Sequence, residues 1–229
     1  MTKKISLGEA LAEFIGSMLL VMSTVSSMIL FTMVFDASIG IAVFANAITV
    51  TFVLCALIEL FMPISGAHFN PVVSIVMAFE KKIAFSKAAI YIIFQIIGGL
   101  AGIALSHLMY FDKIGGIFFI SDYVRSDYIY IGEIVGTFIL VLTFLILAKA
   151  KSRKISIIVS MMVGGQIMAT SSTMFANPQV TIARIFTNTP TGIRPTDAMI
   201  FVIMQFIGAA LAYGVYKLMF LQNKAKEER

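Results

Sequence analysis

The stretch that decides the fold is Ser65-Gly-Ala-His-Phe-Asn-Pro-Val-Val73, in which the pair Asn70-Pro71 opens a short apolar segment. A second pair, Asn177-Pro178, opens a similar segment in the other half of the chain. Asn is favoured just before the first turn of a helix, and Pro is favoured at the first helical position, where its missing N–H costs no hydrogen bond. We therefore expect two short helices, at 69–79 and 176–186, each about half as long as a membrane-spanning helix.

The composition around these segments indicates a membrane protein. The 229 residues are 59% hydrophobic and 13% charged, and the mean hydropathy is +0.98, which is too apolar for a soluble domain. Apolar runs predict transmembrane helices at 8–34, 40–62, 84–110, 128–149, 155–173 and 196–221. The expected fold is therefore an all-α membrane protein with six transmembrane helices and two re-entrant half-helices.

The second half of the sequence repeats the first. The matching stretches are Glu13-Phe-Ile-Gly16 with Glu133-Ile-Val-Gly136, Asn70-Pro-Val-Val-Ser-Ile75 with Asn177-Pro-Gln-Val-Thr-Ile182, and Gln95-Ile-Ile-Gly98 with Gln205-Phe-Ile-Gly208. We expect one channel domain over 1–229, built from repeats at 1–111 and 125–229. Because each repeat holds three crossings, an odd number, the two repeats must be inverted relative to each other. The two half-helices then enter from opposite sides, and their N-termini can meet near the midplane around a pore.

The distribution of charge predicts the orientation. Of the 17 Lys and Arg residues, 13 lie near residue 3, in 81–87 and 149–154, and from residue 217 onward, whereas all five Asp residues lie in the alternate loops. Basic loops are retained in the cytoplasm, so we expect a multi-pass protein of the plasma membrane or bacterial inner membrane with both termini cytoplasmic. This asymmetry explains the net charge of +5 without a nucleic-acid partner.

The two Asn-Pro ends supply the chemistry that we expect of the pore. Helix N-termini carry partial positive charge, and an Asn side chain whose oxygen is held by backbone can present amide N–H donors to a neutral hydroxylated solute. We expect a central constriction formed by Asn70, Asn177, Pro71, Pro178, Val72 and Gln179, and carbonyls lining the path from Gly66, Ala67, His68, Thr173 and Phe175. For His68, a ring nitrogen facing the pore and a role in fixing the loop by hydrogen bonding are equally compatible with the sequence.

Two glutamates lie at equivalent places inside apolar helices. We expect Glu13 and Glu133 to accept hydrogen bonds from the backbone of the re-entrant loops, with Gln95 and Gln205 bracing the same loops. A proton relay is the weaker alternative, because no chain of further ionisable residues joins the two glutamates. The lone Cys55 excludes an intrachain disulfide, and no cofactor or metal is expected.

Over essentially the whole chain, these features resemble the aquaporin (major intrinsic protein) superfamily. The motifs that carry the resemblance are Ala12-Glu-Phe-Ile-Gly16, the stretch 65–73 quoted above, Asn177-Pro178 and Gln205-Phe-Ile-Gly-Ala-Ala-Leu211. The resemblance implies a right-handed six-helix bundle with two half-helices, one pore per protomer and a homotetramer in the membrane lipid.

The chain departs from the family's pattern at the residues that set selectivity. The signature triplets read Asn-Pro-Val and Asn-Pro-Gln instead of Asn-Pro-Ala, and Val180 stands where the family usually has the arginine of its outer selectivity filter. Counting from the two Asn residues places the other filter positions at Val50, Gly165 and Met174, so all four are uncharged. The alternative for Gln179, which is larger than the usual alanine, is that its side chain narrows the centre of the pore.

The run Phe175-Ala-Asn-Pro-Gln-Val-Thr-Ile-Ala-Arg184, followed by Gly192-Ile-Arg-Pro195, resembles a bacterial aquaglyceroporin-like subgroup that lacks the filter arginine and is linked to glycerol-like solutes and uncharged arsenic species. We accordingly expect a passive channel for small polyols, water and neutral metalloid acids such as arsenite, which excludes protons and ions, and we expect no enzyme activity. The alternatives are a water-selective aquaporin and, less favoured, an ion-coupled secondary transporter, for which the core lacks coupling residues.

Two arginines near the second half-helix are candidates for the outer vestibule. Arg184 lies one helical turn beyond Val180 on the same face, and Arg194 follows in Gly192-Ile-Arg-Pro195. Either arginine could restore positive charge outside the filter. The other interpretation of Arg184 is a loop residue paired with Asp197 or with a neighbouring carbonyl.

Overall fold

The structure is a computed structural model that describes residues 5–125 and 127–227. The described residues form helices and loops. The long helices are α1 (Leu7–Ile29), continued by a π-helical stretch at Leu30–Val34, α2 (Ile39–Phe61), α4 (Phe85–Met109), α6 (Tyr130–Lys149), α7 (Ile155–Ala169) and α9 (Pro195–Glu227). The short ones are α3 (Pro71–Phe79), α5 (Phe111–Ile114), α8 (Pro178–Ala183) and the 3-10 turns at Asp127–Ile129 and Arg184–Phe186.

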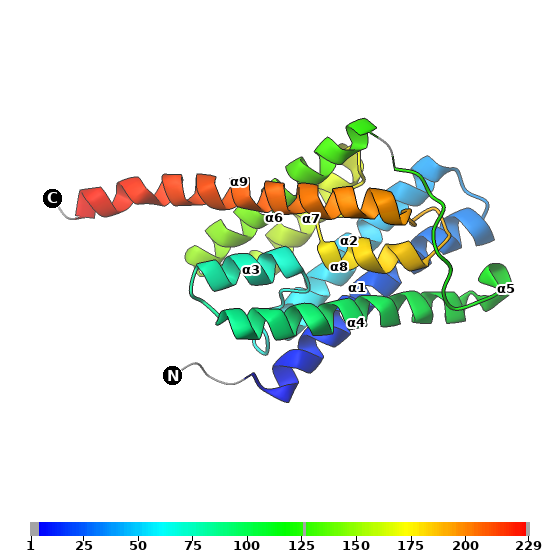
Figure 1. Cartoon of the computed structure of the whole chain (residues 1–229), viewed down its shortest axis with the longest axis horizontal. Helices are drawn as coiled ribbons and strands as arrows, with labels where there is room; N and C mark the ends of the chain where they lie inside the picture. Colours follow the sequence, from blue (N-terminus) through cyan, green and yellow to red (C-terminus); the bar gives the residue numbers. More distant parts are fainter. Residues whose placement is uncertain (1–4, 126, 228–229) are drawn as a thin grey trace.

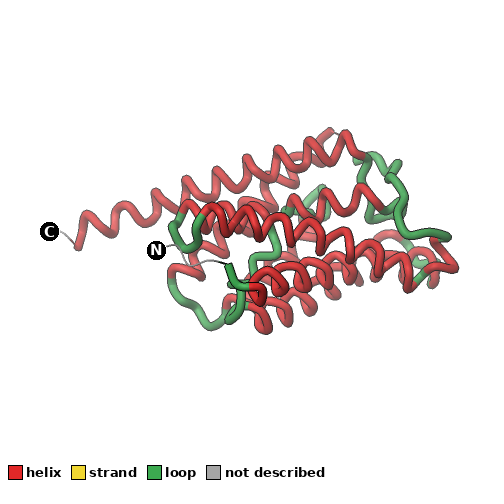
Figure 2. The backbone as a smooth tube through the Cα atoms, turned by 60° about the horizontal axis from the view of Figure 1, so that its bottom comes forward, coloured by secondary structure: helices red, strands yellow, loops and turns green. Residues whose placement is uncertain are grey.

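The long helices form a bundle whose two halves run in opposite directions. In Figure 1, α4 runs from left to right, and its counterpart in the second repeat, α9, runs from right to left. Helix α1 packs most extensively on α4, α6 packs on α9, and α2 packs on α7 of the other repeat. The tube view in Figure 2 shows the loops gathered mainly at the two ends of the bundle, apart from those that enter it. This arrangement is the inverted pair that the sequence repeat predicts.

The two half-helices lie end to end between α4 and α9 (Figure 1). Asn70 caps α3, because its side-chain oxygen accepts a hydrogen bond from the N–H of Val72 at 3.1 Å, and Pro71 is the first helical residue. Asn177 caps α8 in the same way through the N–H of Gln179, also at 3.1 Å. The helices diverge from these caps, so both N-termini point towards the centre of the bundle.

Glycines allow the paired helices to cross closely. A Cβ at Gly98 of α4 would overlap the carbonyl oxygen of Phe14 on α1, and a Cβ at Gly208 of α9 would overlap that of Ile134 on α6. Gly16 and Gly136 have a different role: their missing side chains leave room for Phe69 and Met174 of the re-entrant loops. Small residues therefore set both the helix spacing and the depth to which the loops enter.

The helix bounds depart from the sequence prediction in the second repeat. Where we expected one half-helix over 176–186, the α-helix α8 ends at Ala183 and a 3-10 turn follows it. We expected a fifth crossing over 155–173, but α7 ends at Ala169, because Thr170 takes an extended backbone conformation and its hydroxyl donates to the carbonyl of Gln166 at 2.7 Å. The chain then enters the bundle as a loop. At the other end of the sequence, α9 continues to Glu227, beyond the expected end at 221.

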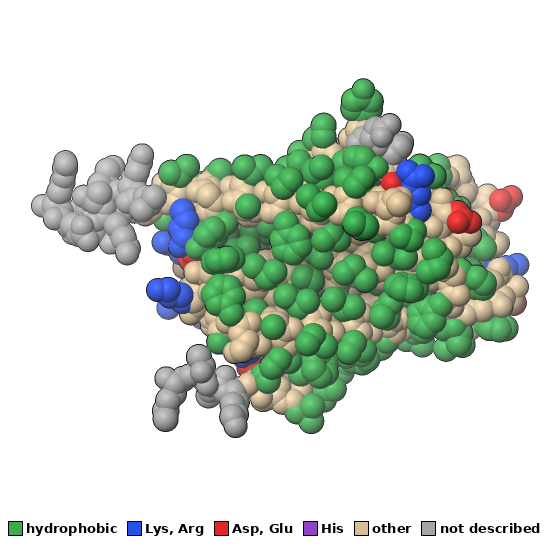
Figure 3. Space-filling view, viewed as in Figure 1, with side chains coloured by type: hydrophobic (Ala, Val, Ile, Leu, Met, Phe, Trp, Pro, Cys, Tyr) green, Lys and Arg blue, Asp and Glu red, His purple; other side chains and the backbone are tan. Residues whose placement is uncertain are grey.

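The surface suits a lipid environment. In the described part of the chain, five helices are long and apolar enough to cross a membrane, and α7 is a shorter apolar helix of 15 residues. In Figure 3, hydrophobic side chains cover the flank of the bundle. Basic side chains gather at the end where α9 projects, and the first and last described residues lie at that same end (Figures 1 and 3).

The α1–α4 crossing gives a stability prediction. Replacing Gly98 with Ala places a methyl group against the Phe14 carbonyl, and overpacking of this kind costs about 1–3 kcal/mol of folding stability. Gly214→Ala in α9 is the matched control, since a Cβ there meets no atom within 4 Å. Thermal unfolding in detergent should show a lower midpoint for Gly98→Ala alone, and equal midpoints for the two variants would contradict the close crossing.

Candidate solute pore

A cavity of about 200 Å³ runs through the bundle between the two repeats. On α2, the residues that line it fall on one face from Ile39 to Ile58, a length of about 28 Å for an α-helix. A bilayer's hydrocarbon core is about 30 Å thick, so the cavity extends over nearly the whole distance that a solute would have to cross.

The cavity wall is largely apolar, with polar groups at intervals. The helices contribute Leu20, Thr24 and Met28 from α1; Ile39, Val43, Asn46, Val50, Leu54 and Ile58 from α2; Val73 from α3; Leu140 and Phe144 from α6; Val159, Val163 and Ile167 from α7; and Val180 from α8. Asn46 and Thr24 were not predicted from the sequence. A polar residue such as Asn46 inside an apolar helix was the available signal, and its amide donates to the carbonyl of Thr24 at 2.8 Å.

At the middle of the cavity, each half-helix cap is bonded to the loop of the other repeat. The Asn70 side-chain nitrogen donates to the carbonyl of Ala176 at 2.9 Å, and that of Asn177 donates to the carbonyl of Phe69 at 2.8 Å. Both Asn residues line the cavity. Because a side-chain amide carries two N–H groups, each Asn retains a second donor beside the open space.

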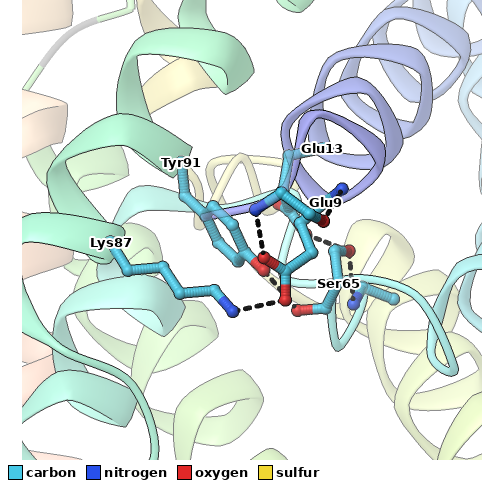
Figure 4. Close-up of polar contacts among 7 residues, drawn as sticks. Glu9, Glu13, Ser65, Lys87 and Tyr91 are labelled. Carbon is cyan, nitrogen blue, oxygen red and sulfur yellow. Dashed lines mark hydrogen bonds and ion pairs between the residues drawn. The ribbon is translucent and has the colours of Figure 1, made fainter. Parts of the chain in front are cut away.

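Glu13 holds the first re-entrant loop from within α1. Its carboxylate is fully buried and accepts from the backbone N–H groups of His68 at 3.0 Å and Phe69 at 2.7 Å, and from the hydroxyl of Ser65 at 2.6 Å. Figure 4 shows Glu13 beside Ser65, with Tyr91 of α4 reaching the same loop. The Tyr91 hydroxyl donates to the carbonyl of Ser65 at 2.9 Å.

Glu133 of α6 repeats this arrangement for the second loop. Its two oxygens accept from the N–H groups of Phe175 and Ala176, each at 2.9 Å. Gln95 and Gln205 complete the two sites: Gln95 donates to Glu13 at 2.7 Å and to Ser74 at 3.0 Å, and Gln205 donates to Glu133 at 2.5 Å and to Thr181 at 2.8 Å. The repeated Ser74 and Thr181 thus receive equivalent hydrogen bonds.

The loops adopt a backbone that the carboxylates stabilise. Ala67 and Phe69 have φ of 50° and 46°, and their counterparts Met174 and Ala176 have φ of 44° and 47°. This left-handed region is unfavourable for residues other than glycine, by about 1–3 kcal/mol each. The hydrogen bonds from consecutive N–H groups to Glu13 and Glu133 hold the loops in this shape.

His68 combines both of the roles that the sequence left open. It lines the cavity, and its Nδ1 lies 3.0 Å from the hydroxyl of Ser74, so the ring faces the open space while it ties the loop to α3. Ala67, Thr173 and Phe175 also line the cavity. Among the residues that the structure describes, no group of three or more His, Cys, Asp or Glu side chains could hold a metal ion.

Comparison with known proteins agrees with this architecture. The family model "Major intrinsic protein" matches residues 1–176. The chain belongs to the major intrinsic protein family. This is a family of passive membrane channels and not of enzymes, so the expected multi-pass channel fold is confirmed. The match ends immediately before Asn177-Pro-Gln-Val180, where the chain departs from the family's usual residues.

Individual relatives are both bacterial and eukaryotic. Aquaglyceroporin AqpS of Rhizobium meliloti (strain 1021) is 38% identical over 207 residues, which cover 90% of this chain and 87% of that protein. Aquaporin PIP2-4 of Zea mays is 30% identical over 145 residues, 58% of this chain and 50% of that protein. The X-ray structure of the aquaglyceroporin from Plasmodium falciparum has the same fold, with a TM-score of 0.69, 19% identity and coverage of 92% and 95%.

Against this family, the structure corrects one position of the expected selectivity filter. Val50, Met174 and Val180 line the cavity, but Gly165 does not. The cavity face of α7 carries Val159, Val163 and Ile167 at successive turns, and Gly165 lies on the opposite, exposed side of the helix. Counting back from Asn177 gives a position along the chain but not the face of α7 on which it lies, and Ile167 is the residue at the wall.

Several residues expected at the central constriction also lie away from the cavity. Val72 of α3 is fully buried in a cluster with Val141 of α6 and Ala209 of α9, and it does not line the cavity. Gln179 points towards Gly99 of α4, where the missing Cβ leaves room for its oxygen, and its nitrogen lies 3.4 Å from the Phe69 carbonyl. Gln179 therefore does not narrow the pore. Pro71, Pro178 and Gly66 likewise do not line the cavity, although both prolines start the half-helices.

The two candidate vestibule arginines differ. Arg184 lines the cavity and is only 5% exposed, and its Nε donates to the Thr191 carbonyl, so it is not paired with Asp197. Arg194 does not line the cavity: its side chain is 42% exposed and forms an ion pair with Asp197 at 2.9 Å.

A third arginine, Arg125, does line the cavity and was not predicted. Its isolated position in a loop with several acidic residues gave no indication of where its side chain would lie.

The corrected α7 face gives a matched pair of variants. Ile167→Phe adds bulk to the cavity wall and should lower solute flux several-fold, whereas Gly165→Phe adds a ring on the outer side of α7 and should leave flux unchanged. Stopped-flow light scattering on proteoliposomes under a glycerol gradient measures both. A loss of flux in Gly165→Phe with none in Ile167→Phe would show that Gly165, and not Ile167, lies at the selectivity filter.

The loop braces give a second prediction. In Glu133→Gln, one carboxylate oxygen becomes an NH₂ group that cannot accept, so a buried backbone N–H loses its partner at about 1–3 kcal/mol. We expect a lower unfolding midpoint and reduced flux. Glu59→Gln is the control, because Glu59 is exposed and accepts from the Ser156 hydroxyl at 2.8 Å. Equal midpoints for the two variants would show that Glu133 does not hold the loop.

Proposed function

We propose that this chain conducts small uncharged solutes, including water and glycerol-like polyols, passively along the cavity between its two repeats. The observation that carries the proposal is the pair of half-helix caps at the cavity centre. Asn70 and Asn177 are each fixed by one bond to their own helix and one to the opposite loop. Their remaining N–H donors can replace hydrogen bonds that a hydroxylated solute loses when it leaves bulk water.

Exclusion of cations follows from the same geometry. The N-termini of α3 and α8 face the centre, and each carries up to about half a positive elementary charge. A cation or hydronium ion is therefore disfavoured there, because the positive ends of half-helix dipoles form an electrostatic barrier in pores of this type. The buried carboxylates Glu13 and Glu133 are occupied by backbone and glutamine donors, which favours a bracing role over a proton relay.

The wall composition supports polyols in addition to water. The expected filter residues at the cavity, Val50, Met174 and Val180, are uncharged, and Ile167 adds a further apolar side chain. Apolar walls with few donors suit a molecule that has both carbon-bound hydrogens and hydroxyl groups. Neutral metalloid acids such as arsenite have comparable size and hydroxyl groups, so we include them in the proposed substrate class.

The orientation and assembly are part of the proposal. The basic end of the bundle, where both described ends of the chain lie, would face the cytoplasm according to the positive-inside rule. The location would be the plasma membrane or bacterial inner membrane, and the family resemblance supports a homotetramer with one pore in each protomer.

Glycerol transport separates this proposal from a water-selective channel. In a sorbitol gradient, which measures water flux, proteoliposomes should shrink faster than protein-free liposomes. In a glycerol gradient, they should shrink and then re-swell faster, because glycerol enters. Val180→Arg places a long cationic side chain at the cavity wall and should reduce glycerol entry more than water flux. Wild-type glycerol permeability equal to that of protein-free liposomes, with water flux raised, would identify a water-selective channel instead. Flux that saturates and requires an ion gradient would identify a transporter.

A further inference from the structure

The outer end of the cavity holds two arginines beside one aromatic ring. The guanidinium carbon of Arg184 lies 3.4 Å from the centre of the Phe175 ring, and that of Arg125 lies 4.9 Å from the same centre. All three residues line the cavity. Arg184 comes from the end of the second half-helix, and Arg125 comes from the loop that joins the two repeats.

Arg125 is held in place by the backbone of a distant loop. Its Nε donates to the Gly192 carbonyl at 3.0 Å, and its Nη2 donates to the Pro190 carbonyl at 3.1 Å. Its own backbone N–H donates to the Asp197 carboxylate at 2.7 Å. These contacts fix the guanidinium while leaving the N–H groups of Nη1 without a partner among the described residues. In Arg184, Nε donates to the Thr191 carbonyl, and the N–H groups of Nη1 and Nη2 have no hydrogen-bond partner among the described residues.

The two guanidinium groups have no ion-pair partner of their own. Within the part of the chain that the structure describes, neither forms an ion pair, and the nearby carboxylates of Glu133 and Asp197, which attract them, are bonded to the second re-entrant loop and to Arg194 respectively. Carbonyl oxygens and the Phe175 ring are the direct partners of the two groups. Burial lowers the pKa of both guanidinium groups, and the neighbouring Arg125 lowers that of Arg184 further; the pKa of Arg125 falls to about 10, so this side chain still carries its charge at neutral pH.

We infer that Arg125 is a specificity-determining residue of this channel, and that with Arg184 it supplies the positive charge at the outer mouth which Val180 does not. The two side chains repel small cations before they reach the Asn pair, and their free N–H groups offer hydrogen bonds to solute oxygens. The positive charge thus lies at the cavity mouth and not at position 180, where the short Val180 side chain leaves more room in the filter than an arginine would. This inference rests on the proposed channel function.

Uptake of methylammonium into proteoliposomes at neutral pH, compared with glycerol flux in the same preparation, tests the inference. Arg125→Gln removes the charge but keeps a donor for a loop carbonyl, and it should raise the ratio of methylammonium to glycerol flux about tenfold, or about 1.4 kcal/mol in barrier. Arg125→Lys keeps the charge and should retain a ratio near the wild-type value. Arg194→Gln removes an equal charge outside the cavity and should also leave the ratio unchanged.

The outcomes separate this inference from the proposed function. Wild-type protein without glycerol or water flux would overturn the proposed function. Wild-type flux together with an Arg125→Gln ratio equal to that of Arg194→Gln would overturn the inference alone. Because a misfolded channel would lose glycerol flux as well, the ratio is read only from variants that conduct glycerol. If Arg125→Gln does not conduct glycerol, an Arg125→Lys ratio about tenfold above the wild-type value overturns the inference, and a ratio near wild type supports it.

Discussion

A backbone that enters an apolar bundle without forming a helix must find partners for its N–H groups, and the rest of this structure depends on how that requirement is met. Each re-entrant loop presents two consecutive N–H groups to one buried carboxylate, Glu13 for the first loop and Glu133 for the second. Charged acceptors make stronger hydrogen bonds than neutral ones. The two carboxylates also stabilise loop residues with positive φ, a backbone conformation that is unfavourable for residues other than glycine.

Once the loops are held, the two repeats complete one another. The cap of each half-helix donates to a carbonyl of the opposite loop, so the centre of the cavity is built from both halves at once. A single repeat would leave its Asn donor and its loop carbonyl without these partners. The inverted pair is therefore a physical requirement of the pore as well as a pattern in the sequence.

In the inference drawn above, two roles that one residue often fills in this family fall to different residues. The width of the filter depends on uncharged residues, among them Val180 and Ile167. The charge at the mouth comes from Arg184 and Arg125, which stack beside Phe175 and are bonded to loop carbonyls. In the inference drawn above, this separation lets a wide, largely apolar path coexist with rejection of cations.

The sequence by itself determined the membrane class, the inverted repeat, the half-helices, and the residues that brace the re-entrant loops, which are Glu13, Glu133, Gln95 and Gln205. Hydropathy, Asn-Pro caps and internal symmetry act locally or repeat in register, so they can be recognised without coordinates. Only the tertiary structure decided which side chains face the cavity. A helix turns by about 100° per residue, so two residues of α7 that are two positions apart lie on opposite faces, Ile167 at the cavity wall and Gly165 outside. The position of Arg125 depends on carbonyls of residues 190 and 192, more than 60 residues away in the chain, and no local pattern encodes such a contact.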